Sequence, residues 1–102
     1  MDDVVFNAMT SFQFFCNHYF KQKNIDKLMP KGMLRSDWNT QKIALLNEEI
    51  ESVNRYFDEQ AALRLQDFTA SANRQEIENR FAVTITKAMD NYKAKIKDYY
   101  LY

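Results

Sequence analysis

The sequence predicts an all-α fold, with three antiparallel helices in a single domain that spans residues 1–102. The chain has one Gly and one Pro among its 102 residues, so it lacks the tight turns of a β-sandwich or barrel. Apolar residues recur every three or four positions in three stretches, and no stretch alternates as a strand does. The length and the 46% share of hydrophobic residues suit one core and argue against intrinsic disorder.

The first helix should span residues 3–22. Acidic residues in its first turn suit the positive end of the helix dipole. The apolar positions cover about half of the helix circumference at about 100° per residue, which predicts a wide buried face. Its members are Val4, Val5, Ala8, Met9, Phe12, Phe15, Cys16, Tyr19 and Phe20. Phe14 falls on the opposite side, near His18, so we expect it to lie outside the core.

A basic loop should follow the first helix. Residues 21–35 contain five bases and one acid. A short helical turn over residues 24–29, capped by Asn24, should end before Pro30, because the residue before a proline is disfavoured in the α region. The rest of the connection should be irregular. Its packing residues should be Met33, Leu34 and Trp38.

The second helix should span residues 39–69, because residues 37–40 include side chains suited to an N-cap. Apolar residues then recur at alternating spacings of three and four, as in a coiled coil, before they relax to an ordinary helical stripe. This stripe comprises Ile43, Leu46, Ile50, Val53, Phe57, Ala61, Leu65 and Phe68. A second apolar line, displaced by about 100°, comprises Leu45, Tyr56 and Leu63. This second line exceeds the needs of a three-helix core.

The third helix should span residues 73–100. Its apolar stripe comprises Ile77, Phe81, Ile85, Ala88, Tyr92, Ile96 and Tyr99. A small polar patch over residues 69–73 should separate it from the second helix, and Asn73 with Glu76 matches a capping box. Without this break, residues 40–99 would form one helix of about 90 Å, which could bury its apolar face only in an oligomer. With the break, the two helices form a hairpin on which the first helix packs.

Residues that carry catalysis or bind cofactors are scarce. His18 is the only histidine, which excludes histidine-based zinc and di-iron sites. Cys16 lies about 200° from His18 around the first helix, so the two cannot act on one substrate, and we expect Cys16 in the core. One glycine cannot build a phosphate-binding loop. We therefore expect no cofactor, no metal and no enzymatic activity. The remaining catalytic alternative is an enzyme that uses carboxylates alone.

The chain shows no sign of export or of membrane insertion. A single cysteine cannot form an intramolecular disulfide. The first residues are acidic, whereas a secretory signal begins with a basic segment. Residues 4–20 carry no formal charge, but they include too many polar side chains for a membrane span. We therefore expect a cytoplasmic protein.

One candidate partner-binding surface is an acidic flank on the second helix. Its members are Glu48, Glu51, Asp58 and Glu59. Residues 36–68 hold seven acids and three bases, an excess that would attract a partner protein with a basic surface. The alternative is a solvated face, stabilised by the helical spacing of Arg55 from Glu51 and from Glu59.

Aromatic side chains are the other candidates for partner binding, because tyrosine offers interfaces a rigid apolar body with a polar tip. The candidates are Tyr56, Tyr100 and Tyr102, together with Phe14 and His18 on the uncharged outer side of the first helix. The predicted function is a small non-enzymatic protein-binding module, such as an inhibitor or an immunity or antitoxin-like protein that blocks its partner. The alternative is a self-assembling helical subunit or adaptor. Nucleic acid is not expected as a partner, because the basic loop lacks stacking aromatics.

Overall fold

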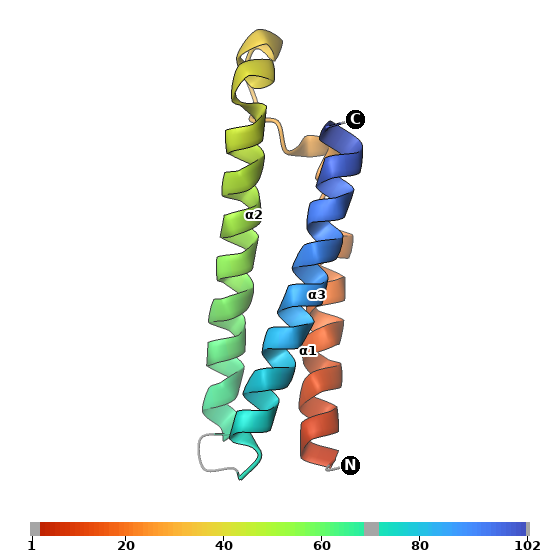
Figure 1. Cartoon of the computed structure of the whole chain (residues 1–102), viewed down its shortest axis with the longest axis vertical. Helices are drawn as coiled ribbons and strands as arrows, with labels where there is room; N and C mark the ends of the chain where they lie inside the picture. Colours follow the sequence, from red (N-terminus) through yellow and green to blue (C-terminus); the bar gives the residue numbers. More distant parts are fainter. Residues whose placement is uncertain (1–2, 69–71, 102) are drawn as a thin grey trace.

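Three long helices make up most of the protein (Figure 1). The computed structural model describes residues 3–68 and 72–101, and every regular element within these ranges is helical. The long helices are α1 (Asp3–Gln22), α2 (Arg35–Leu65) and α3 (Arg74–Tyr100). Two short 3-10 turns, η1 (Ile25–Lys27) and η2 (Gln66–Phe68), follow α1 and α2. The predicted all-α, three-helix fold class is confirmed.

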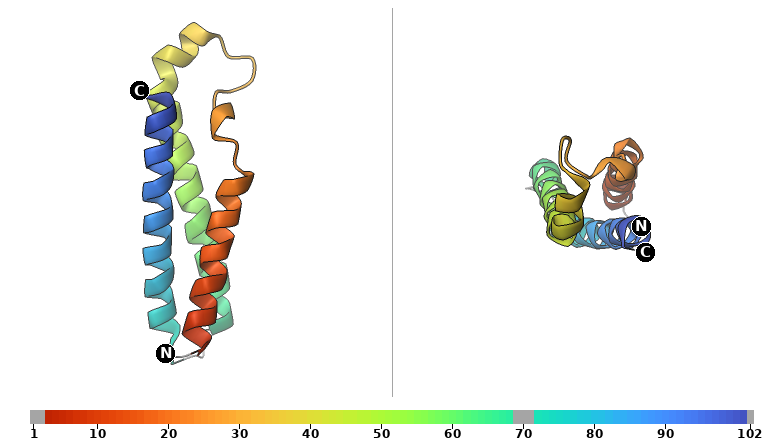
Figure 2. Two further views of the ribbon diagram at one scale, coloured as in Figure 1. Left: turned by 90° about the vertical axis from the view of Figure 1, so that its right-hand side faces the viewer. Right: turned by 90° about the horizontal axis from the view of Figure 1, so that it is seen from above.

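The helices form an elongated bundle with principal extents of 54 × 20 × 18 Å. α1 and α3 run in the same direction, and α2 runs antiparallel to both (Figure 1). Seen along the long axis, the three helices occupy the corners of a triangle (Figure 2). Most close backbone approaches between helices join α3 to α1 or α3 to α2. α3 is therefore the helix on which the other two pack.

The centre of the core contains one phenylalanine from each helix. Phe12, Phe57 and Phe81 are almost completely buried, and the ring centroids of Phe12 and Phe81 lie 4.4 Å apart. Burial of each large side chain contributes about 1.5–3 kcal/mol. Around these rings the core comprises Val5, Cys16, Trp38, Leu46, Val53, Ala61, Leu65, Ile77, Ile85, Met89, Tyr92 and Ile96. The predicted core positions of Phe12, Phe57 and Cys16 are confirmed.

Aromatic side chains fill the space between α1 and α2. The ring of Phe15 lies 6.1 Å from that of Phe57, and the ring of Tyr19 lies 5.3 Å from that of Phe57. Tyr56 is also within 5.4 Å of Tyr19, measured between ring centroids. Tyr56 belongs to the second apolar line of the α2 sequence, and its contact with α1 accounts for that residue, whereas Leu63 of the same line is exposed.

The start of α2 was predicted incorrectly. The helix begins at Arg35, four residues before the expected position, and Leu34 occupies the N-cap without a side-chain capping hydrogen bond. Trp38 therefore lies inside α2, where it is buried and packs edge-on against Tyr100 at a centroid distance of 5.6 Å. Burial of a tryptophan outweighs the roughly 1 kcal/mol of a good N-cap. Leu34, expected to pack the loop, is 67% exposed.

Some predicted core residues lie at the surface. Ile43 is 64% exposed, and Val4 and Tyr99 are also exposed. Val4 and Tyr99 lie near the ends of their helices, and Ile43 lies in the third turn of α2, whose first turns extend past the end of α1 (Figure 2). Conversely, Thr84 and Met89 are buried although neither belonged to the predicted stripe. α3 packs against two helices, so its buried face is wider than one stripe.

The connection after α1 and the connection before α3 both differ from their predictions. The turn expected over residues 24–29 is the shorter η1, and Asn24 precedes it without a side-chain capping bond. At the other end, Asn73 occupies the N-cap of α3, but its side chain does not cap the first turn, so the predicted capping box is incomplete. The rest of the predicted break includes residues 69–71, which lie outside the described residues. α2 and α3 nevertheless form a hairpin, so residues 40–99 do not form the alternative single helix of about 90 Å.

Candidate partner-binding surfaces

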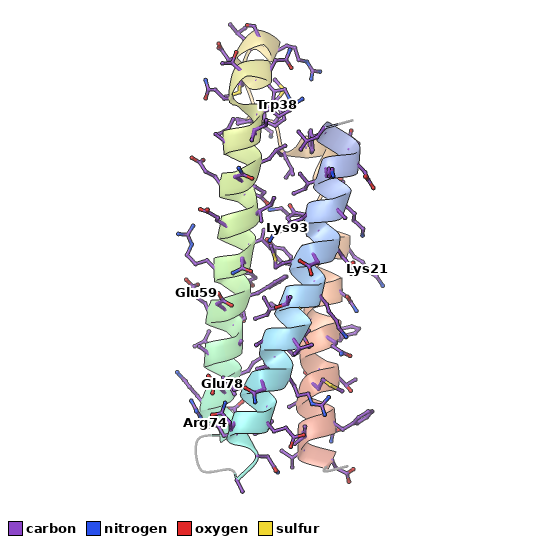
Figure 3. The ribbon with its side chains drawn as sticks, in the orientation of Figure 1. Lys21, Trp38, Glu59, Arg74, Glu78 and Lys93 are labelled. Atoms are coloured by element: carbon purple, nitrogen blue, oxygen red, sulfur yellow. The ribbon has the colours of Figure 1, made fainter. Side chains whose placement is uncertain are left out.

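The acidic residues of α2 do not share one surface. Glu48, Glu51, Asp58 and Glu59 are all exposed, but only Glu51 and Asp58 border a shallow groove of about 390 Å³ between α2 and α3. Ile50, Asn54, Arg55 and Lys93 line the same groove. Lys93 lies between α2 and α3, whereas Glu59 is on the far side of α2 (Figure 3). The four acids of the predicted flank therefore do not form one continuous surface.

The groove carries both signs of charge. The Asn54 side chain donates a hydrogen bond of 3.2 Å to an Asp58 carboxylate oxygen. Arg55 and Lys93 line the groove with Glu51 and Asp58, and none of the four forms an ion pair within 4.0 Å there. Nearby charges of opposite sign reduce the field at a distance. The groove is therefore weaker as an acidic docking surface than the number of acids in α2 indicates.

The outer face of α1 presents an exposed aromatic pair. Phe14 is 71% exposed, and its ring stacks on the His18 imidazole with a centroid distance of 5.9 Å and an interplanar angle of 9°. Phe6 is also exposed on this helix. Residues 4–20 carry no formal charge. This face therefore combines exposed aromatic rings with neutral polar side chains.

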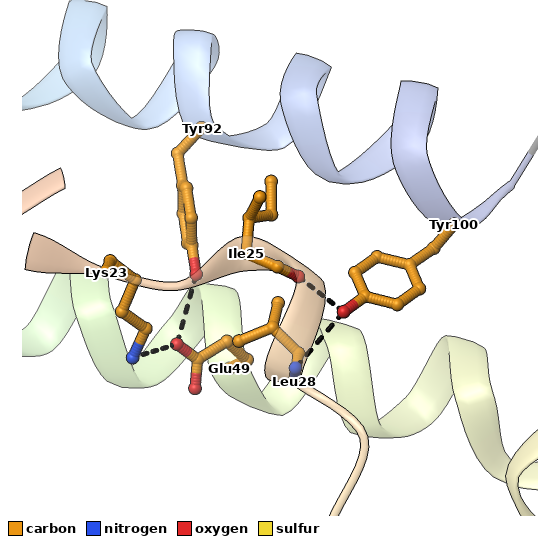
Figure 4. Close-up of polar contacts among 6 residues, drawn as sticks. All are labelled: Lys23, Ile25, Leu28, Glu49, Tyr92 and Tyr100. Atoms are coloured by element: carbon orange, nitrogen blue, oxygen red, sulfur yellow. Dashed lines mark hydrogen bonds and ion pairs between the residues drawn. The ribbon is translucent and has the colours of Figure 1, made fainter. Parts of the chain in front are cut away.

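The tyrosine candidates are placed differently. Tyr56 keeps 37% of its surface exposed while it packs against α1. Tyr100 is half-buried, and its hydroxyl donates to the Ile25 carbonyl and accepts a hydrogen bond of 3.1 Å from the Leu28 amide (Figure 4). Tyr102 lies outside the described residues. The Tyr100 hydroxyl is thus used within the fold, where it holds the connection that contains η1 against α3.

The sequence did not predict a partly buried polar network that joins Lys23, directly after α1, to α2 and α3. Glu49 of α2 accepts a hydrogen bond of 3.1 Å from the Tyr92 hydroxyl of α3, and the same oxygen lies 2.5 Å from the Lys23 ammonium (Figure 4). Burial raises the pKa of Tyr92, and the Glu49 carboxylate raises it further. Burial acts to lower the pKa of Lys23, but the hydrogen bond and charge of Glu49 more than offset this, so that pKa is raised. The network therefore joins three segments with Lys23 charged and Tyr92 protonated.

Cys16 is a core residue with an unreactive thiol. Its side chain is 1% exposed. Burial raises the pKa of the thiol from its ordinary 9.0 to about 11, and the nearby Arg64 opposes this only in part. Because the thiolate is the nucleophile, the protonated thiol is inert at neutral pH.

Arg64 lies at a pocket that the sequence reasoning missed. The pocket has a volume of about 350 Å³. Its lining comprises Val4, Asn7, Ala8, Ser11, Arg64, Asp67, Phe68 and Phe81. The signal was present in the sequence, because Arg64 follows Phe57 by seven residues and therefore shares the core-facing side of α2. A charged residue at a core-facing position of a helix indicates that a polar group lies beside the core there.

Across residues 3–68 and 72–101, no group of three or more His, Cys, Asp or Glu side chains is arranged to hold a metal ion. None of the helices in these ranges is both long enough and apolar enough to cross a membrane. Comparison of the chain with protein-family models, with curated proteins and with solved structures gave no match.

Proposed function

We propose that the chain is a small, non-enzymatic protein-binding module whose partner docks on the outer face of α1. The observation that carries the proposal is the exposed Phe14 ring, stacked on His18 within a helix that has no formal charge from residue 4 to residue 20. The central regions of protein interfaces are enriched in aromatic residues and depleted of charged ones. An exposed aromatic ring also gains more from burial than a polar side chain.

The acidic residues of α2 have a secondary role in this proposal. Since Glu51 and Asp58 share their groove with Arg55 and Lys93, they are suited to the rim of an interface. Rim charges chiefly affect the association rate and its salt dependence. A basic surface on the partner would therefore speed encounter without supplying most of the affinity.

Within this class, we propose an inhibitor, or an immunity or antitoxin-like protein, that acts in the cytoplasm by blocking a site on its partner. Small size and the scarcity of catalytic side chains support this assignment by analogy. The self-assembling subunit is less well supported. The apolar stripe that resembled a coiled-coil seam includes Leu46, Val53 and Phe57, and all three are buried inside the bundle.

Site-specific photocrosslinking in the native host tests the proposal. A benzophenone amino acid at Phe14 should yield a discrete crosslinked product with a different protein, identified by mass spectrometry. The matched control places the same group at Val83, which is exposed on α3. Equal crosslinking at both positions, or products formed only between copies of this chain, would argue against a docking face on α1.

A further inference from the structure

The pocket beside Arg64 lies where α1 begins and α2 ends, at the lower end of the bundle in Figure 1. Val4, Phe68 and Phe81 contribute apolar surface to its lining, and Asn7 and Ser11 contribute neutral polar groups. Its volume of about 350 Å³ falls within the usual size range of small-ligand sites. The residues come from all three helices and from η2, so the pocket depends on the folded bundle.

Arg64 places a positive charge in this pocket and forms no ion pair within the described residues. Its guanidinium carbon lies 4.8 Å from the centre of the Phe15 ring and 5.7 Å from that of Phe12. Its Nε is buried and has no hydrogen-bond partner. In the part of the chain that the structure describes, no carboxylate lies within 4.0 Å of the Arg64 nitrogens. The aromatic rings hold the guanidinium in position but accept none of its hydrogen bonds.

These features define the chemistry of a ligand. A planar guanidinium pairs with a carboxylate through two parallel hydrogen bonds, and a buried polar group without a partner is costly. Asp67 lines the same pocket, so a second negative charge on the ligand would be repelled. The apolar lining favours an aliphatic chain next to the carboxylate. The site is thus suited to one negative charge on an apolar body.

We propose that this pocket binds a small aliphatic monocarboxylate. The carboxylate pairs with Arg64 and can accept a further hydrogen bond from Asn7 or Ser11. The chain packs against Val4, Phe68 and Phe81. The proposal does not depend on a protein partner, so it can fail while the docking face on α1 stands, and the reverse also holds.

Amide NMR spectra of the isotope-labelled full chain test the proposal with three probes of equal chain length: hexanoate, hexanol and hexylamine. Hexanoate should bind saturably with a dissociation constant of about a millimolar, as expected for so small a ligand. The shifted signals should belong to the residues that line the pocket. Hexanol should bind at least about tenfold more weakly, because it lacks the charge that pairs with Arg64. Hexylamine should not bind.

Two matched variants assign the selectivity to one side chain. Arg64→Met keeps an unbranched side chain without charge and should weaken hexanoate binding by about tenfold or more. Arg55→Met makes the same change on an exposed part of α2 outside the pocket and should leave binding unchanged. Because the three probes are compared on the unaltered protein, the result does not depend on whether Arg64→Met folds.

Several results would overturn the proposal. These are the absence of saturable shifts with hexanoate, equal binding of hexanol and hexanoate, or unchanged binding by a folded Arg64→Met variant. Binding of an amphipathic acidic peptide in the pocket, without binding of hexanoate, would also overturn it, because the site would then belong to a partner protein.

Discussion

Two cationic side chains beside the core, Lys23 and Arg64, differ in whether a carboxylate of the described residues lies within 4.0 Å. Lys23 lies 2.5 Å from the Glu49 carboxylate, which also accepts the Tyr92 hydroxyl. Arg64 packs over two phenylalanine rings, and its buried Nε has no hydrogen-bond partner. A buried polar group with its partners in place stabilises the fold, whereas an unsatisfied one costs free energy. The difference favours a structural role for Lys23 and agrees with the ligand-binding role that we propose for Arg64.

The largest expected effect comes from the ring beneath Arg64. Phe12→Ala should lower the free energy of unfolding by about 3–5 kcal/mol, because it leaves a cavity in the core and removes one of the rings that hold the guanidinium. Phe14→Ala, on the exposed side of the same helix, should change it by less than about 0.5 kcal/mol. Denaturant titration measures both. Equal losses would show that α1 is buried on all sides, which would leave no outer face for a partner.

Alkaline pH should destabilise the protein through one group beside each cation, and the two losses should begin at different pH values. The folded-state pKa of Cys16, which lies near Arg64, is about 11 against an ordinary 9.0. Above pH 9 the unfolded chain loses this proton first, so stability should fall as pH rises from about 9 to about 11. Tyr92, which donates to the carboxylate that pairs with Lys23, also has a raised pKa, and the loss of stability from its ionisation should begin near its ordinary value of 10.0. Thermal melts of Cys16→Ala should lack the earlier fall and retain the later one.

Removal of each cation compares the two side chains directly. Lys23→Met should cost about 1–2 kcal/mol, because it leaves the partly buried Glu49 carboxylate without its cation. The control Lys21→Met changes an exposed lysine two residues away and should cost less than about 0.5 kcal/mol. Arg64→Met should cost less than Lys23→Met, since it removes an unsatisfied Nε along with the charge. If Arg64→Met cost more than Lys23→Met in chemical denaturation, Arg64 would be chiefly a structural residue.

The smallest effect should come from the acids of α2. Replacement of Glu51 and Glu59 by Gln should change the free energy of unfolding by less than about 0.5 kcal/mol, because both are exposed. With a basic partner, the double variant should associate more slowly and with less dependence on salt. Stopped-flow association at several ionic strengths measures this. Identical rates for both proteins would assign these acids to an ordinary solvated face.

Helix periodicity predicted the fold because it depends only on local spacing. The interior positions of the stripes, such as Phe12, Phe57 and Phe81, follow directly from that spacing. The start of α2 does not, because it depends on the contact of Trp38 with Tyr100, which is distant in sequence. Ile43 lies on the predicted stripe, but the lengths of the neighbouring helices determine whether the stripe is covered.

The candidate sites were harder to predict than the fold. Phe14 could be recognised as lying off the apolar stripe of α1, because its position depends on one helix. The acids of α2 share a flank in projection, but Lys93 reaches their groove from α3. Arg64 stands on the core side of α2, and only the assembled bundle shows that a pocket lies beside it. A site built from several helices depends on how those helices pack together. The apolar periodicity of each helix does not specify that packing.

The hydrogen bond between Tyr100 and Ile25 also bears on how the chain folds in time. Its two residues are separated by 75 positions, whereas the hairpin of α2 and α3 brings together neighbouring parts of the chain. Closing a long loop carries an entropic cost that is paid before the contact forms. The hairpin should therefore fold first and the connection after α1 should lock last. A contact absent from the transition state slows unfolding without speeding folding, so Tyr100 should prolong the lifetime of the native state.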